Sequence, residues 1–154
     1  MRLLHTTPVP NAIIDVYMKE LGSVELKVLL VIIRQTLGWV DRRSMNGRKE
    51  IDWISGSQLK QKTGCSERAI TQAIDKLIKM KLIEVLDDYG ISLIDSRWRQ
   101  GKPRLFYRLH PHAYRPVDKP EILYSTSANF AEDFRKNYGA LLQKMRITKE
   151  TLTK

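Results

Sequence analysis

The sequence has little of the chemistry on which disulfide-linked, metal-binding and catalytic proteins depend. Its 154 residues include a single cysteine, Cys65, so no disulfide can form within the chain, and its three histidines do not have the spacing of zinc ligands. No paired carboxylates, nucleophile with a neighbouring base or glycine-rich phosphate loop stands out. We therefore expect no metal, no other cofactor and no catalysed reaction.

Long apolar runs are also absent. The chain reaches Pro8 before any stretch of signal-peptide length, and no later run approaches the roughly 20 residues that a membrane-spanning helix needs. A lone cysteine suits a reducing compartment. These features predict a soluble cytoplasmic protein that does not act at a membrane.

Positive charge is the strongest feature of the composition. Lys and Arg number 27 against 17 Asp and Glu, the formal net charge is +10, and most of the excess lies before residue 117. Such a charge favours a polyanionic partner, either nucleic acid or an acidic membrane. Since the apolar runs are missing, nucleic acid is the favoured partner.

Two helices are predicted at the start of the chain. Asn11 can cap a helix whose apolar residues form one stripe as far as Leu21. A second helix, which Ser23 caps, is apolar on nearly all sides and belongs in the centre of a domain. Alternating, β-favouring residues then predict a short strand over 51–54.

The next segment has the pattern of a helix-turn-helix. Ser55 and Gln58 have the spacing of a capping box, which predicts the start of a helix. A tight turn at 64–65 precedes a strongly amphipathic helix over 67–80, which Ser66 caps.

A β-hairpin completes the pattern. Strands are predicted over 82–86 and 104–109, and the connection between them, 87–103, is long and strongly basic. Short helix, turn, amphipathic helix and hairpin, in this order, is the layout of a winged helix. We therefore predict an α+β fold, a mostly helical winged helix-turn-helix domain with a β-hairpin wing, over residues 1–112.

The rest of the chain differs in composition. Prolines without periodicity predict a linker over 113–126, and residues 127–154 predict an amphipathic C-terminal helix and a tail. The apolar side of that helix, a candidate partner interface, consists of Phe130, Phe134, Tyr138, Leu141, Leu142 and Met145. Either its own domain covers these residues, or they bind a second copy or another protein.

The helix over 67–80 is the main candidate for DNA contact, because a helix of this size fits the major groove. Arg68 can pair with a guanine and Gln72 with an adenine, while Thr71 can meet a base or a phosphate. Contacts to the phosphate backbone are assigned to Ser66, Lys76 and Lys79. The alternative is that these residues form an ordinary solvated helix face.

The hairpin is the second candidate, because its cations would repel one another unless they meet phosphates or face solvent. Its backbone contacts are assigned to Arg97, Arg99, Lys102 and Arg104. Trp98 either stacks on an unpaired base or packs in a groove, or it covers the apolar side of the wing itself. A further basic cluster, interpreted as a solvated loop, consists of Arg42, Arg43, Arg48 and Lys49.

Several short motifs resemble those of a known family. They are Val9-Pro10-Asn11, Arg34-Gln35-Thr36-Leu37-Gly38-Trp39, Asp52-Trp53-Ile54-Ser55, Gln58-Leu59 and Thr63-Gly64-Cys65-Ser66-Glu67-Arg68-Ala69-Ile70. With them, residues 8–86 resemble the N-terminal domain of phage replication protein O and of related replication initiators of mobile elements. The resemblance implies a winged-helix domain that binds repeated sites in a replication origin, followed by a segment that recruits the replicative helicase or its loader. Two departures are a longer wing and a very short C-terminal part.

We therefore predict a DNA-binding replication initiator or replication accessory protein of a phage, plasmid or other mobile element. Duplex DNA is the favoured ligand and single-stranded DNA the other candidate. Expected protein partners are a replicative helicase, a loader or a polymerase, and a second copy of the chain. Three alternatives stay open: a transcriptional regulator on the same fold, a single-stranded-DNA-binding partner of a replication enzyme, and a protein-interaction module whose charge serves solubility.

Overall fold

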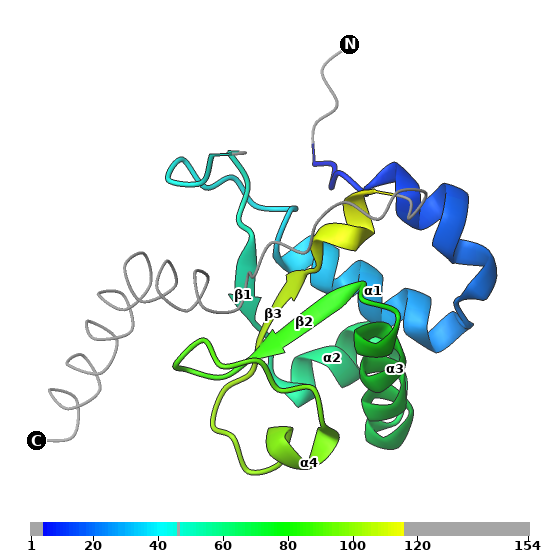
Figure 1. The fold of residues 1–154 in the computed structure, drawn as a ribbon, viewed down its shortest axis with the longest axis vertical. Coiled ribbons are helices and arrows are strands. Elements are labelled where there is room, and N and C mark those ends of the chain that lie inside the picture. Colours follow the sequence, from blue (N-terminus) through cyan, green and yellow to red (C-terminus); the bar gives the residue numbers. More distant parts are fainter. Residues whose placement is uncertain (1–4, 46, 116–154) are drawn as a thin grey trace, which may run out of the picture.

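The computed structural model of the protein describes residues 5–45 and 47–115. In this part, helices pack against a three-stranded antiparallel sheet, and the order of elements confirms the predicted α+β winged-helix fold (Figure 1). The predicted C-terminal helix over 127–154, with its apolar stripe, lies outside the described residues. Among the helices of the described ranges, none has the length and apolar content needed to cross a bilayer.

Helix α1 (Ser23–Gln35) lies at the centre of the helical layer and packs against α3 (Glu67–Lys79). Burying a large aliphatic side chain contributes about 1.5–3 kcal/mol, so this contact decides which side of α3 faces inward. The residues that the two helices bury are Val28, Leu29, Ile32 and Ile33 from α1 and Ile70, Ala73, Ile74 and Leu77 from α3.

The segment before α1 is helical, but not as predicted. It consists of a π-helical turn, η1 (Ile13–Tyr17), and a 3₁₀ turn, η2 (Met18–Glu20). A π turn holds more residues than an α turn, which moves the following side chains off a 3.6-residue stripe. Ile14 is exposed, so the predicted stripe is wrong, and the N-cap position falls on Ala12 instead of Asn11.

The sheet has its third strand in the middle. Strand β3 (Phe106–Leu109) pairs antiparallel with β1 (Ile51–Trp53) on one side and with β2 (Ile83–Leu86) on the other. All three strands were predicted, and each is one or two residues shorter than expected. Val85 and Tyr107 are partners in the register of β2 and β3, and both are buried in the core.

The helix-turn-helix agrees with the prediction in detail. Helix α2 (Gly56–Thr63) begins with the expected capping box: the Ser55 hydroxyl accepts from the Gln58 amide at 3.1 Å, and the Gln58 side chain accepts from the Ser55 amide at 3.0 Å. Gly64 then takes a left-handed conformation with φ of +69°, which favours glycine because it has no Cβ. The hydroxyl of Ser66 caps α3 as predicted.

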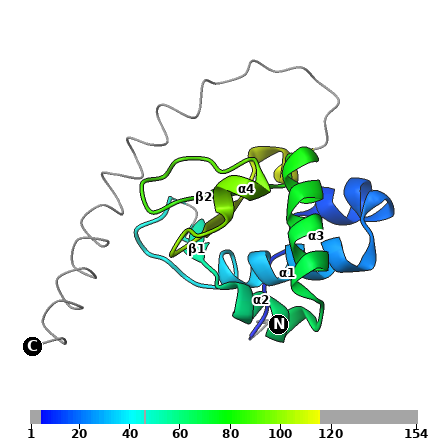
Figure 2. The same cartoon turned by 90° about the horizontal axis from the view of Figure 1, so that it is seen from below.

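The wing, residues 87–105, folds back on the domain. The Leu93 amide donates to the Val85 carbonyl at 2.8 Å, and the Leu93 side chain is buried. The wing then forms a one-turn helix, α4 (Ser96–Arg99), which lies beside α3 (Figure 2). The prediction of a hairpin with a long basic tip is therefore wrong in its shape, because apolar and charged contacts hold the connection against the rest of the fold.

The folded part also extends further than predicted. After β3, residues Pro111–Tyr114 form a 3₁₀ helix, η3, in which Ala113 is fully buried. The Tyr17 hydroxyl donates to the His112 carbonyl at 3.2 Å and so connects η3 to η1. The helical turn η3 thus continues to Tyr114, past residue 113, where the linker was predicted to begin.

Replacing Ser55 by alanine tests the capping box. The Ser55→Ala variant loses one of its two reciprocal hydrogen bonds, so we expect the free energy of unfolding to fall by about 1 kcal/mol. Urea denaturation followed by circular dichroism measures this loss. Gln61→Ala, an exposed position of the same helix, is the matched control. Equal stability of the two variants would show that the cap does not stabilise the fold.

Candidate nucleic-acid interface

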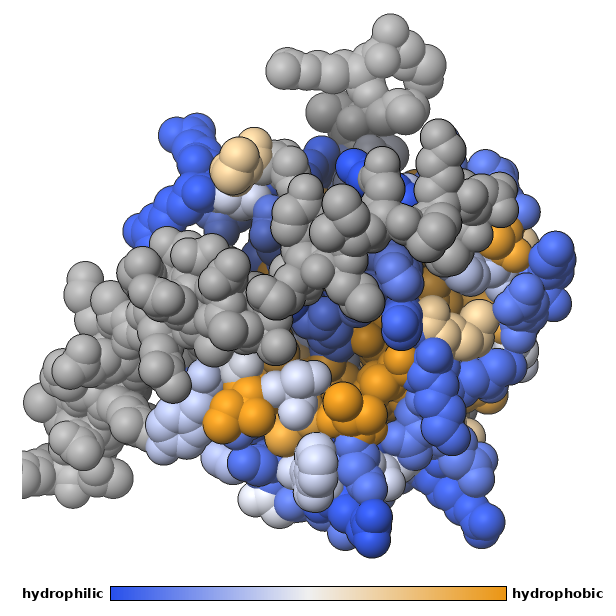
Figure 3. Space-filling view, viewed as in Figure 1, coloured by the Kyte–Doolittle hydropathy of each residue, from blue (hydrophilic) through white to orange (hydrophobic). Residues whose placement is uncertain are grey.

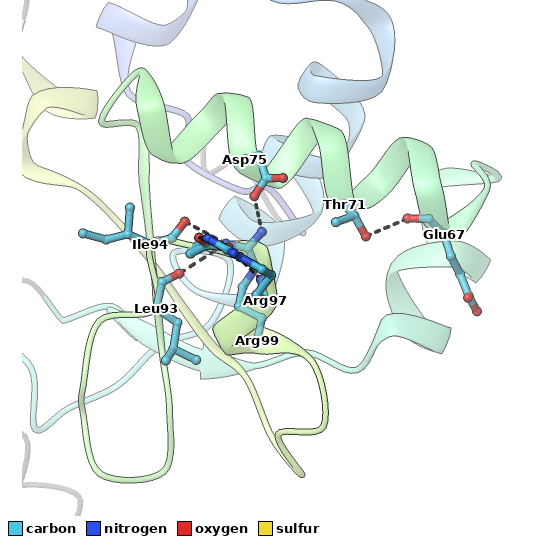
Figure 4. Close-up of polar contacts among 8 residues, drawn as sticks. Glu67, Thr71, Asp75, Leu93, Ile94, Arg97 and Arg99 are labelled. Carbon is cyan, nitrogen blue, oxygen red and sulfur yellow. Dashed lines mark hydrogen bonds and ion pairs between the residues drawn. The ribbon is translucent and has the colours of Figure 1, made fainter.

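The outward side of α3 carries the predicted readout residues at its N-terminal end. Arg68, Thr71 and Gln72 are all exposed, because the apolar residues on the opposite side are buried against the core. The Thr71 hydroxyl donates to the Glu67 carbonyl at 2.9 Å, so its proton is already bonded and the oxygen can act towards a ligand only as an acceptor (Figure 4). Within its first two turns the helix thus presents the guanidinium of Arg68 as a donor, the hydroxyl oxygen of Thr71 as an acceptor and the side-chain amide of Gln72, which can do both.

The two lysines assigned to phosphates differ in position. Lys79 is exposed near the end of α3. The Lys76 ammonium instead donates to the Glu20 carbonyl at 3.0 Å and lies 3.6 Å from the Glu25 carboxylate. In this structure Lys76 connects α3 to the segment before α1, and its assigned phosphate contact stays a prediction. Ser66 is exposed, and while its oxygen accepts from an amide, its hydroxyl hydrogen can still donate to a phosphate.

Arg99 was predicted to contact the DNA backbone, but its side chain faces inward. Its side chain is only 5% exposed and its guanidinium forms an ion pair with Asp75 of α3. The same guanidinium donates to the carbonyls of Leu93 and Ile94 at 3.2 and 3.1 Å (Figure 4). A DNA-backbone contact by Arg99 does not fit this structure, because its guanidinium is buried and its donors are bonded to Asp75 and to two backbone carbonyls.

Arg97, in the same short helix, does face outward. Its side chain is 82% exposed and pairs with Asp95 at 2.8 Å. The hydrogen bonds from the Arg97 side chain and backbone lower the pKa of Asp95 to about 2, and the Asp95 carboxylate raises the pKa of Arg97. Trp98, its neighbour, is 59% exposed, so more than half of this side chain is open to solvent.

The other two wing cations have partners at the base of the wing. The Lys102 ammonium bonds to the Asp87 carboxylate at 3.1 Å. The Arg104 guanidinium lies over the Trp53 ring, 5.9 Å from its centroid. Both cations are therefore partly committed to holding the wing, and Arg97 is the wing cation with the greatest exposure among those assigned to DNA.

Asp87 is a buried acid whose hydrogen bonds stabilise the base of the wing. It is 4% exposed and accepts from the amides of Tyr89 and Ile91 at 2.9 and 3.0 Å, besides its bond from Lys102. Burial by itself raises the pKa of this carboxyl, but the three hydrogen bonds and the lysine charge outweigh it, so the pKa lies below its ordinary value.

Some residues of this surface were not predicted as functional. Exposed apolar side chains accompany Trp98 on the wing, namely Tyr89, Ile91 and Ile94. No role was predicted for Asp75. Its partner, Arg99, lies 24 residues further along the chain, so no local pattern could connect the two. Within residues 5–45 and 47–115, no group of three or more metal-ligating side chains comes together.

The loop of the second basic cluster lies away from α3 in both views (Figures 1 and 2). In this loop Arg42 and Arg43 are exposed, whereas Arg48 donates to the Leu37 carbonyl at 3.5 Å and Lys49 forms an ion pair with Asp52. Arg42 and Arg43 therefore offer positive charge on a different side of the domain from the recognition helix.

The lowered pKa of Asp87 gives a prediction for stability against pH. A carboxyl whose pKa is depressed by folding stabilises the native state above its unfolded value and loses that contribution as the pH falls through the folded value. We expect Asp87→Asn to lower the free energy of unfolding by about 1–3 kcal/mol at pH 7. The difference from the unchanged protein should shrink below about pH 4.

Urea denaturation at several pH values measures this difference. Asp88→Asn is the control, since it makes the same change at the next residue, where the buried Oδ1 has no hydrogen-bond partner among the described residues. A pH-independent loss in Asp87→Asn would contradict the role of its charge.

Comparison with known proteins gives the family. A model of the bacteriophage replication protein O family matches residues 6–93, more than half of the chain, and this match confirms the resemblance noted in the motifs. The matched range includes α1, α2 and α3 and ends before α4. Searches of curated proteins and of solved structures found no match. The chain therefore belongs to the bacteriophage replication protein O family, and its role is in phage replication.

Proposed function

We propose that the protein binds duplex DNA at a replication origin, with the N-terminal half of α3 in the major groove and the wing near the backbone, and that it catalyses no reaction. The observation that carries this proposal is the exposed polar end of α3. Arg68, Thr71 and Gln72 project from a helix whose opposite side is buried. The match to the family supports a replication origin as the place of binding.

The spacing of these residues suits the reading of neighbouring base pairs. Arg68 and Gln72 lie four residues apart on one side of α3, a rise of about 6 Å, and base pairs stack roughly 3.4 Å apart. A guanidinium can donate twice to a guanine edge, and a primary amide pairs with an adenine edge. Thr71, with its hydroxyl proton bonded inside the helix, is suited to accept from a base amine.

Backbone contacts would come from groups on either side of this helix. Ser66 at the start of α3 and Lys79 near its end are exposed, and Arg97 projects from α4. The Arg97–Asp95 pair is solvent-accessible, so a phosphate can replace the carboxylate at small cost. These contacts supply affinity and salt dependence, and the readout residues supply sequence preference.

The protein would bind this DNA in the cytoplasm of the host cell. A replicative helicase, its loader or a polymerase is the protein partner that the family role favours, and pairing of two copies would double the length of DNA that is read. The predicted partner interface in the C-terminal helix lies outside the described residues.

The proposal predicts that replacing a readout residue lowers sequence preference, whereas replacing a backbone-contact residue lowers affinity for every duplex. A preferred duplex is first selected from a random pool with the unchanged protein. Arg68→Ala and Gln72→Ala should each weaken binding to that duplex by about 1–3 kcal/mol and leave binding to random duplex nearly unchanged. Arg97→Ala should weaken both and lower the salt slope by about one.

Fluorescence anisotropy at several salt concentrations measures these affinities. Arg42→Ala removes the same charge from a side of the domain that lies away from α3, and it should leave discrimination between the two duplexes intact. Equal losses on both duplexes for all the variants would overturn the readout assignment.

A specific observation favours single-stranded DNA as a second candidate ligand. Trp98 is 59% exposed beside Arg97, and Tyr89, Ile91 and Ile94 add exposed apolar area to the wing. In the space-filling view, hydrophobic residues gather below the centre, over the sheet and the wing, among hydrophilic ones (Figure 3). An indole next to a cation is a surface on which unpaired bases stack.

Replacing Trp98 distinguishes the two ligands. If unpaired bases stack on this ring, Trp98→Ala should weaken binding to a single-stranded oligonucleotide by about 1–3 kcal/mol and spare the duplex. Trp39→Ala, which removes another exposed indole, is the matched control. A single-strand affinity that Trp98→Ala does not change would exclude this second function.

A further inference from the structure

The wing of this protein is joined to the recognition helix by a buried charged contact. The guanidinium of Arg99, in α4, forms an ion pair with Asp75, in α3, and also donates to the carbonyls of Leu93 and Ile94 (Figure 4). One side chain therefore bonds to the preceding stretch of the wing and to α3 at the same time. This contact connects elements that are 24 residues apart in sequence.

The position of α4 depends on this contact more than on its own stability. A helix of four residues is too short to be stable alone, because each end leaves backbone groups unbonded. Of its residues Arg99 alone is buried, while Arg97 and Trp98 face solvent. A guanidinium buried to this extent must have acceptors, and three oxygen-bearing groups surround it.

Asp75 occupies a sensitive place on α3. It follows Gln72 by three residues and precedes Lys79 by four, so it lies on the same side of the helix as both. A carboxylate at this place would repel the phosphates of a duplex held against the helix. The Arg99 guanidinium neutralises that charge from within the protein, so the side of α3 that faces DNA does not carry an uncompensated negative group.

We propose that Asp75 and Arg99 are positioning residues: by holding α4 against α3 they determine how the recognition helix approaches DNA, and so which sequences the domain distinguishes. This inference rests on the proposed binding of duplex DNA. With α4 beside the middle of α3, the N-terminal half of the helix, with Arg68 and Gln72, is the part open to a groove. The family match ends at residue 93, so it includes Asp75 but not Arg99.

The first test needs no DNA. Amide hydrogen exchange, followed by mass spectrometry on the full chain, reports how firmly α4 is held. In Asp75→Asn we expect the amides of residues 96–100 to exchange about tenfold faster, because a charge-assisted hydrogen bond is lost, while α3 keeps its protection. Glu67→Gln removes the same charge from the same helix two turns earlier and should change nothing in α4. Unchanged exchange at 96–100 in Asp75→Asn would overturn the inference.

The second test measures discrimination between a duplex selected by the unchanged protein and a random-sequence duplex. Asp75→Asn and Arg99→Lys should each reduce the ratio of the two affinities by about tenfold, with little change in salt slope, since neither variant removes a cation. Because both disrupt one contact, the double variant should lose no more than either single variant. Arg42→Lys, the same substitution at an exposed arginine on a loop that lies away from α3, should keep the ratio.

The outcomes separate this inference from the proposed function. If Asp75→Asn and Arg99→Lys keep full discrimination, the positioning role is wrong even though DNA binding stands. If the unchanged protein binds no duplex at any salt concentration, the proposed function is wrong, and the role of the contact in sequence discrimination falls with it. The exchange experiment then still decides whether Asp75 holds α4 in place.

Discussion

The packing of α3 on α1 determines which way the other surfaces of the domain face. Because one side of α3 is apolar and buried along its whole length, each remaining residue has a fixed place relative to α1, the wing and the solvent. On the exposed side of α3, Lys76 bonds to η2 and Asp75 pairs with Arg99 of α4, while Arg68 and Gln72 stay open to solvent. The candidate interface is thus a consequence of the apolar stripe as much as of its own polar residues.

The net charge of the chain overstates the charge available to a polyanion. Among the cations of the wing, Arg99, Lys102 and Arg97 each pair with a carboxylate within the domain. These pairs differ in accessibility, and so in what they can do. A buried pair fixes structure, because breaking it leaves an uncompensated charge, whereas an exposed pair can exchange its carboxylate for a phosphate at little cost. The difference in burial therefore distinguishes Arg99 and Lys102, which hold the wing, from Arg97, which is the most suited to contact DNA.

The features that could be predicted from the sequence are those encoded within a turn or two of chain. The capping box of Ser55 and Gln58, the turn at Gly64 and the cap at Ser66 depend on residues at most three positions apart, and all agree with the structure. The outward direction of Arg68 and Gln72 follows from the buried stripe in the same way.

The features that could not be predicted depend on contacts between distant residues. The fold of the wing, the burial of Arg99 and the diversion of Lys76 are set by partners 24 and 56 residues away. The π turn of η1 and the continuation of the domain into η3 likewise arise from packing, as the bond from Tyr17 to the His112 carbonyl shows. A count of cations in a basic segment contains no information about which of them find a carboxylate. For that reason the assigned DNA contacts on the wing needed the most correction.

The division of α3 into two parts has a geometric basis. The helix has 13 residues and is about 20 Å long, whereas proteins that read the major groove with such a helix use mainly its N-terminal residues. Its C-terminal half would lie beyond the reach of base edges, and this is the half that holds η2 through Lys76 and the wing through Asp75. Packing and recognition therefore do not compete for the same positions. The two residues that make these contacts, Asp75 and Lys76, follow Gln72 by three and four positions along α3, so the N-terminal end of the helix stays exposed.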